Sequence, residues 1–316
     1  MTRPPRNRLS PLYSIAMVLL ALIALIYVVS ALPVDELSEI QFRTLSLWTI
    51  PVVVLMHSAY LLLSAEVWRR LVFAVTGMHS RFSDAYLQMA SVAAGKYVPG
   101  KIWGIVARTG QLQRIGVSAP MSAVSTVIEQ LAVFVGGGIV VVGAALLAFP
   151  EYTSGIVVAG VALLFSLMVL PQYAPRIIGW VQRRRGGSER ALPAVEGASR
   201  YWLQYSFAHV LLWLISGAIL CVIYFSLFGA EVNVQSAAAL ILANTIGFII
   251  GFLAVFAPAG LGVREATTVA VLAPFFPVRE ALIAAIALRA WIVLFDGINC
   301  GMMFIVELRR AARNTN

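Results

Sequence analysis

The sequence contains few charged residues for its length: 12% of its 316 residues are Asp, Glu, Lys or Arg, whereas 60% are hydrophobic. A soluble domain of ordinary composition carries about 25% charged residues. The mean hydropathy of +0.89 and the long uncharged runs instead predict an α-helical protein that crosses a membrane several times. The composition therefore excludes an ordinary soluble enzyme.

Cysteine and lysine are nearly absent, with two residues of each in the chain. Because Cys221 and Cys300 both lie in apolar runs, we expect free buried thiols and neither a disulfide nor a metal site. The net charge of +9 comes almost entirely from arginine, which marks the cytoplasmic side of a membrane protein. The charge therefore does not indicate nucleic acid as a partner, and no cofactor is expected.

Six apolar runs are long enough to cross a bilayer, which requires roughly 20 helical residues. They cover residues 12–32, 45–65, 120–149, 154–171, 205–228 and 281–306. The first run follows three arginines but has no A-x-A cleavage pattern, so we keep it as a retained span. Three more arginines follow the last run. We therefore expect a multi-pass protein of the cytoplasmic (inner) membrane with both termini in the cytoplasm.

The chain is expected to form a single transmembrane domain over residues 1–316. Its first half covers about 1–172 and its second half about 205–310, joined by a loop over about 172–204. That loop contains six arginines against two glutamates. It is too small for a catalytic domain, so we interpret it as a cytoplasmic topology signal with some contact to anionic lipid.

A charged and irregular stretch breaks the apolar pattern at residues 95–103. It holds both lysines of the chain and two backbone breakers: Lys96, Pro99, Gly100 and Lys101. The apolar arms around it, 85–95 and 102–107, are too short to cross the bilayer and predict a re-entrant helical hairpin from the cytoplasmic side. The spacing also resembles a nucleotide-binding loop, but Ile102 replaces the Ser/Thr that would hold Mg²⁺.

A second broken stretch lies within 232–276, where Gly247 and Gly251 are followed by Pro258, Gly260 and Gly262. With both termini cytoplasmic, this region must begin and end outside, as a hairpin from the outer face. The prediction is thus about six full transmembrane helices plus two re-entrant helical hairpins in an inverted-topology repeat. Such repeats place a transport site near the midplane on discontinuous helices.

Charged residues inside the apolar segments are costly, and they are commonly functional. We predict that an anionic headgroup binds at basic residues and one acid on or near the two breaks: Lys96, Lys101, Arg108, Arg264, Glu265 and Arg289. Arg264 is the strongest phosphate ligand, because a guanidinium can bind phosphate through two nitrogens. Arg264 and Glu265 splay apart on a helix and should have different partners.

Two further acids, Glu129 and Asp296, are candidates for ion coupling or for an ion pair that joins the two halves. Glu129 and Arg289 follow their hairpins at similar distances and are expected to pair. Arg289 and Asp296 are seven residues apart and so share one helix face. No catalytic residue is expected.

Several other residues are expected to serve packing or the membrane interface. Gly136 to Gly138 should allow close helix contact. His57, His209 and Asn244 are read as packing residues in apolar runs. The tryptophans expected at the interface are Trp48, Trp68, Trp202 and Trp213.

The two broken stretches resemble the lysylphosphatidylglycerol synthase transmembrane-domain family, the YbhN/AglD-like flippase-type integral membrane proteins. The residues that carry the likeness run from Lys96 to Trp103 and from Pro258 to Glu265, where Ala259 replaces a glycine usual in the family. The likeness covers nearly the whole chain and implies a lipid-translocating domain with re-entrant helices. Two-part relatives add an aminoacyl-lipid synthase domain, which we do not expect in a chain of 316 residues.

The sequence favours a flippase or scramblase for an anionic lipid, either a phospholipid or a polyprenyl-phosphate-linked sugar, in the cell envelope. An alternative is a membrane-embedded partner of a lipid-modifying or glycosyltransferase enzyme. A third alternative is a glycosyltransferase itself, suggested by the acidic pair Asp35 and Glu36, although no metal-binding cluster of acids is present in the sequence. Since no nucleotide motif is complete, lipid movement would be passive or ion-coupled.

Overall fold

The computed structural model describes residues 48–97, 103–163, 198–254 and 257–313, and every regular element among them is helical. The helices are α3 (Thr49–Thr76), α4 (Phe82–Gly95), α5 (Trp103–Gln113), α6 (Ala119–Ala148), α8 (Ala198–Phe228), α9 (Val234–Leu253), α10 (Val263–Leu272) and α11 (Val278–Arg313). Two 3₁₀ turns, Pro150–Tyr152 and Pro258–Gly260, and a helical segment over 153–163 complete the described chain. The first predicted span, 12–32, lies outside these residues, as does most of the loop over 172–204.

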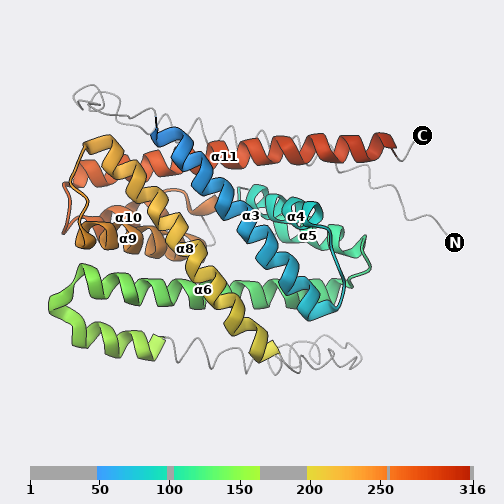
Figure 1. Ribbon diagram of the computed structural model, residues 1–316, viewed down its shortest axis with the longest axis horizontal. Helices are drawn as coiled ribbons and strands as arrows, with labels where there is room; N and C mark the ends of the chain where they lie inside the picture. Colours follow the sequence, from blue (N-terminus) through green and yellow to red (C-terminus); the bar gives the residue numbers. More distant parts are fainter. Residues whose placement is uncertain (1–47, 98–102, 164–197, 255–256, 314–316) are drawn as a thin grey trace.

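The helices form an elongated bundle in which α6 and α11 run along opposite sides, and α3 and α8 run diagonally across one face of it (Figure 1). Two pairs of neighbouring helices occupy the ends of this bundle. We call α4 and α5 hairpin 1, and α9 and α10 hairpin 2. The order of a long helix, a hairpin and another long helix therefore occurs twice, as α3 to α6 and as α8 to α11.

Five of the described helices are long and apolar enough to cross a membrane, which confirms a multi-pass all-α membrane protein. They are α3, α6, residues Gln204–Phe228 of α8, α9 and residues Val278–Val306 of α11. The predicted breaks at Gly247 and Gly251 are wrong, because α9 continues through both glycines to Leu253. The number of spans and the re-entrant insertion of the hairpins stay predictions.

Helix α3 is longer than the apolar run that predicted it. The expected end at residue 65 is wrong, since the helix continues to Thr76 and stops at Gly77, which has a positive φ of 69°. The charged residues after 65 are accommodated on one face, where Glu66 bonds both Arg69 and Arg70. The opposite face is buried, so packing extends the helix beyond the point where its hydropathy falls.

Hairpin 1 is held together by an exceptionally close approach of its two helices. A Cβ atom added to Gly95 would lie 2.1 Å from the backbone nitrogen of Gly104, and one added to Gly104 would lie 2.7 Å from Cα of Val92. Only glycine at both positions permits this contact, and α4 and α5 are 14 and 11 residues long. At about 1.5 Å per residue both arms are shorter than the ~30 Å of a bilayer core.

We expect Gly95→Ala to destabilise the protein by about 1–3 kcal/mol, because the added methyl group must push backbone away from backbone. Gly110→Ala is the matched control in the neighbouring helix, since its Cβ would meet nothing within 4 Å. The control should instead raise stability by about 0.5–1 kcal/mol through helix propensity. Thermal unfolding in detergent measures both; equal behaviour of the two variants would contradict the close contact.

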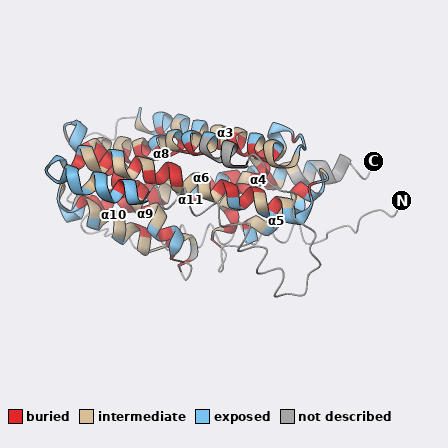
Figure 2. Ribbon diagram, turned by 90° about the horizontal axis from the view of Figure 1, so that it is seen from below, coloured by how far each residue is buried: buried red, intermediate tan, exposed pale blue. Residues whose placement is uncertain are grey.

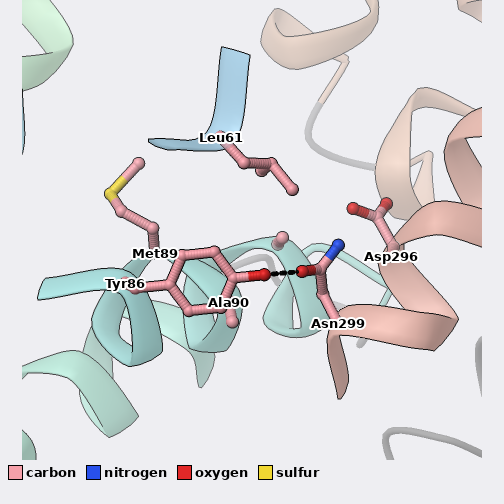
Figure 3. Close-up of a pocket in the computed structure, with 7 residues that line it drawn as sticks. Leu61, Tyr86, Met89, Ala90, Asp296 and Asn299 are labelled. Atoms are coloured by element: carbon pink, nitrogen blue, oxygen red, sulfur yellow. Dashed lines mark hydrogen bonds between the residues drawn. The ribbon is translucent and has the colours of Figure 1, made fainter. Parts of the chain in front are cut away.

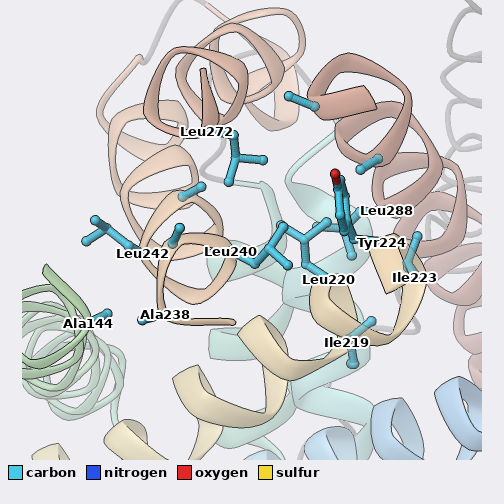
Figure 4. Packing of buried hydrophobic residues seen from close by; sticks show 14 of the residues in the cluster. Ala144, Ile219, Leu220, Ile223, Tyr224, Ala238, Leu240, Leu242, Leu272 and Leu288 are labelled. Atoms are coloured by element: carbon cyan, nitrogen blue, oxygen red, sulfur yellow. The ribbon is translucent and has the colours of Figure 1, made fainter. Parts of the chain in front are cut away.

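The two largest clusters of buried hydrophobic residues lie among α8 to α11 and around α4 and α5, and buried residues gather at both places in Figure 2. The larger cluster joins four helices through Leu220, Leu240, Leu272 and Leu288 (Figure 4). The predicted role of the glycines in α6 is confirmed, because a Cβ on Gly136 would lie 2.8 Å from the backbone oxygen of Ser206 in α8. Each hairpin is therefore anchored in its own core.

Candidate functional site

The ends of the two hairpins meet inside the protein. At the end of α4, the carbonyl oxygen of Lys96 accepts a hydrogen bond of 2.8 Å from the backbone N–H of Ala259. Ala259 belongs to the turn between α9 and α10 and has a positive φ of 50°, flanked by Gly260 at 75°. The two breaks, 163 residues apart in sequence, are thus joined by main chain, as the inverted repeat predicts.

Helix α11 binds both hairpin ends through two residues on one face. Arg289 donates from Nη2 to the carbonyl oxygen of Ala259 at 2.9 Å. Seven residues further along, Asp296 accepts at Oδ2 from the ammonium of Lys96 and from the hydroxyl of Tyr97, both at 2.6 Å. The predicted shared face of Arg289 and Asp296 is confirmed, and it faces both hairpin ends near the middle of the candidate span.

Arg264 lies beneath the second break, enclosed by its own hairpin. Gly247 and Gly251 of α9 let α10 approach closely enough for the Arg264 backbone and side chain to pack on them. The side chain is buried; Nη2 donates to Oδ1 of Asn244 at 3.1 Å, and the guanidinium lies 5.2 Å from the centre of the Phe248 ring. Within the described part of the chain, Arg264 forms no ion pair.

Glu265 has different partners from its neighbour, as predicted. It accepts from the backbone N–H of Gly262 at 2.7 Å and so caps α10. Its other carboxylate oxygen lies 3.6 Å from Nε of Arg289, too far for a hydrogen bond, and neither of these two buried atoms has a hydrogen-bond partner among the described residues. Glu265 therefore forms only a long ion pair with Arg289, without a hydrogen bond.

We call these residues the tip cluster: Lys96, Tyr97, Ala259, Arg264, Glu265, Arg289 and Asp296. It contains three cationic side chains and two carboxylates, a surplus of one positive charge among the described residues. Burying unbalanced charge in an apolar protein is costly, and such sites usually serve a ligand. The surplus positive charge of the tip cluster favours an anionic ligand.

Three of the predicted site residues cannot be placed in this cluster. Pro99, Gly100 and Lys101 fall within 98–102, outside the described residues. The other predicted breaks, Pro258, Gly260 and Gly262, do form the irregular turn before α10. The turn explains how backbone polar groups and an arginine reach the middle of an apolar bundle.

Arg108 and Glu129 form a separate, closed pair, so the predicted pairing of Glu129 with Arg289 is wrong. Arg108 Nη1 lies 2.8 Å from Glu129 Oε2, and Nη2 donates to Thr126 at 2.9 Å. The guanidinium is stacked on Trp68 at 3.8 Å, and both charged side chains are less than one-tenth exposed. This geometry fits a structural pair that ties α5 to α6, and we place it outside the binding site.

Sequence reasoning missed several residues that complete these sites. Trp68 and Trp213 were expected at the membrane interface, but both are buried, where Trp68 covers Arg108 and Trp213 donates to the carbonyl oxygen of Val133. Asn244 was read as a packing residue, although it is the partner of Arg264. Tyr97 was passed over. Their only sequence signal is a polar atom within an apolar run.

The remaining chemical expectations concern cysteines and metals. Cys221 and Cys300 are both free thiols; Cys300 is buried, as predicted, whereas Cys221 is only partly buried. Among the described residues, no group of His, Cys, Asp and Glu is arranged to hold a metal ion.

The chain matches a known family over the segments that form this site. The family model described as "Lysylphosphatidylglycerol synthase TM region" matches residues 13–298, which include both hairpins and the whole tip cluster. No curated protein matches the chain.

Proposed function

This chain belongs to the family of the lysylphosphatidylglycerol synthase transmembrane region, and we propose that it moves an anionic lipid across the membrane as a flippase or scramblase. Membership makes it a membrane protein of lipid metabolism or transport. The proposal adds the route of the lipid: its headgroup crosses at the tip cluster, while its acyl chains stay in the bilayer.

The observation that carries the proposal is the buried guanidinium of Arg264. Its described acceptor is a neutral amide oxygen, so the charge is not balanced by a carboxylate. A phosphate is the natural ligand for such a group, because it accepts two parallel hydrogen bonds from one guanidinium. Of the neighbouring cations, Lys96 is paired with the carboxylate of Asp296, whereas Arg289, like Arg264, donates to a neutral oxygen, that of Ala259.

The surroundings of the tip cluster favour a lipid over a soluble anion. The long helices expose large apolar side chains on their outer faces, including Leu55 and Leu62 on α3 and Leu294 and Ile298 on α11. Acyl chains can remain against such faces while a headgroup enters the protein. The Lys96 side chain is one-third exposed, so the cluster is not sealed at the end of hairpin 1.

The proposal includes the cytoplasmic membrane as the location, with both termini in the cytoplasm, and lipid as the partner in place of a catalytic activity. The alternatives are a non-transporting partner of an envelope lipid- or glycan-modifying enzyme and a glycosyltransferase. The tip cluster supports binding of a charged headgroup under all three functions. A measurement of lipid transport is therefore what distinguishes a flippase or scramblase from the two alternatives.

Transport is tested by reconstituting the purified protein in liposomes that contain a fluorescent phosphatidylglycerol in both leaflets. Dithionite added outside quenches only the outer leaflet, so lipid movement appears as loss of the protected half of the signal. We expect loss in protein-containing vesicles and protection in empty ones, with phosphatidylcholine moving more slowly than the anionic lipid. If the inner-leaflet fluorescence stays protected for several labelled anionic lipids, the protein does not translocate lipid. Activity that appears only when a lipid-modifying synthase is also present would favour the partner role.

A further inference from the structure

A small pocket opens beside the tip cluster between α3, α4 and α11 (Figure 3). Its apolar side is formed by Leu61, Met89 and Ala93, and its polar side by Tyr86, Asp296 and Asn299. The space is sufficient for one water-sized group. The pocket therefore suits a single polar group and is too small for an acyl chain or a whole headgroup.

Most polar atoms of this pocket are already used. Asn299 accepts from the Tyr86 hydroxyl and donates from Nδ2 to the carbonyl oxygen of Phe295 at 2.7 Å. Asp296 uses Oδ2 for both Lys96 and Tyr97. No described residue donates a hydrogen bond to its Oδ1, although the side chain is only 6% exposed. Oδ1 is not among the fully enclosed atoms without a partner, and Asp296 lines the pocket, so a hydrogen-bond donor in the pocket can bind this oxygen.

The neighbouring charge decides which donor fits. The Lys96 ammonium lies 2.6 Å from the same carboxylate and already neutralises it, so a second cation would be repelled and would gain little. A neutral hydroxyl avoids this repulsion and still forms a hydrogen bond to a charged acceptor, which is among the stronger kinds. Size and charge thus both favour an O–H group.

We propose that Asp296 is a specificity residue that binds a hydroxyl of the lipid headgroup while Lys96 and Arg264 bind the phosphate. This inference rests on the proposed function and narrows its substrate to anionic phospholipids with a hydroxylated headgroup. A phosphate at Lys96 brings a hydroxyl two or three bonds further on within reach of Oδ1, because Lys96 and Asp296 are in contact. Glycerol and inositol headgroups share this chemistry.

Liposome transport of four lipids tests the proposal: phosphatidylglycerol, phosphatidylinositol, phosphatidylmethanol and phosphatidylethanolamine. Phosphatidylmethanol has the same charge as phosphatidylglycerol and no headgroup hydroxyl. We expect it to move about tenfold more slowly, because the site's acceptor then stays unpaired. The ratio of phosphatidylinositol to phosphatidylglycerol identifies whether the hydroxyl comes from a ring or from glycerol.

Two variants locate this discrimination in the pocket. Asp296→Leu removes both acceptor oxygens at similar volume, and Ala93→Leu fills the pocket without changing charge. Each should bring the phosphatidylglycerol to phosphatidylmethanol ratio close to one. Ala123→Leu on the exposed face of α6 is the matched control and should keep the wild-type ratio.

The outcomes separate this inference from the proposed function. Equal movement of phosphatidylglycerol and phosphatidylmethanol by the wild type overturns the hydroxyl site and leaves lipid transport standing. Faster movement of phosphatidylethanolamine also overturns it, because the pocket would then bind an ammonium. If no anionic lipid moves at all, the proposed function itself fails. Should Asp296→Leu not fold, the wild-type ratio and Ala93→Leu still decide the question.

Discussion

Arg264→Met is expected to reduce transport of anionic lipid about 30-fold or more while leaving the protein folded. Truncating one partner of a buried, hydrogen-bonded charge pair costs roughly 2–5 kcal/mol, which is the loss expected for the bound phosphate. Methionine preserves most of the side-chain volume, so the packing on Gly247 and Gly251 is maintained. Initial rates in the liposome assay measure the loss.

Stability distinguishes this role from a structural one. Within the described chain Arg264 has no carboxylate partner, so removing its charge relieves a burial cost, and the unfolding temperature of Arg264→Met should equal or exceed that of the wild type. Arg264→Lys should retain part of the transport, because it keeps the charge and loses the paired nitrogens. Arg81→Ala, an exposed arginine at the start of α4, serves as control. Wild-type rates in Arg264→Met, or strong destabilisation, would remove Arg264 from the site.

The opposite pattern is expected for the pair of Arg108 and Glu129. Either single variant, Arg108→Met or Glu129→Met, should lower the free energy of unfolding by about 3–5 kcal/mol, because each leaves a buried charge without its partner. The double variant should recover most of this loss, since two apolar side chains replace two charges. Thermal or denaturant unfolding of the four proteins in detergent gives the coupling free energy.

An exposed pair on α3 provides the comparison. Glu66 and Arg70 are 2.6 Å apart, but the Arg70 side chain is 70% exposed. Neutralising that pair should change stability by less than about 1 kcal/mol, because water screens it. Similar small effects at Arg108 and Glu129 would mean that their pair is hydrated in the membrane, and it would then return to the list of candidate ligands.

The two halves of the protein attach their hairpins with ion pairs of opposite polarity. In the first half an arginine on the hairpin meets an acid on the next long helix, Arg108 with Glu129 at 2.8 Å. In the second half an acid on the hairpin faces an arginine on the next long helix, Glu265 with Arg289 at 3.6 Å. The first pair is closed and the second is loose. Hairpin 2, which also carries Arg264, is therefore held to its long helix by the weaker of the two ion pairs.

The sequence alone determined the class of protein and the position of its irregular segments. Low charge and long apolar runs require a helical membrane protein, because the bilayer leaves few other ways to pair backbone groups. Residues that interrupt helices indicated where the two irregular segments lie to within a few residues. Pro258, Gly260 and Gly262, for example, affect the backbone conformation at their own positions. Helix periodicity placed Arg289 and Asp296 on one face. These features depend on neighbours in sequence or on the solvent.

Only the tertiary structure decided which charges meet. Glu129 could have paired with Arg289 by its place in the repeat, yet Arg108, 21 residues away, lies against it because α5 packs on α6. Gly247 and Gly251 read as helix breaks but serve as flat surfaces for Arg264, and a long helix survives them because its packing outweighs their low helix propensity. Partners across helices follow from side-chain packing in three dimensions, which no local pattern contains.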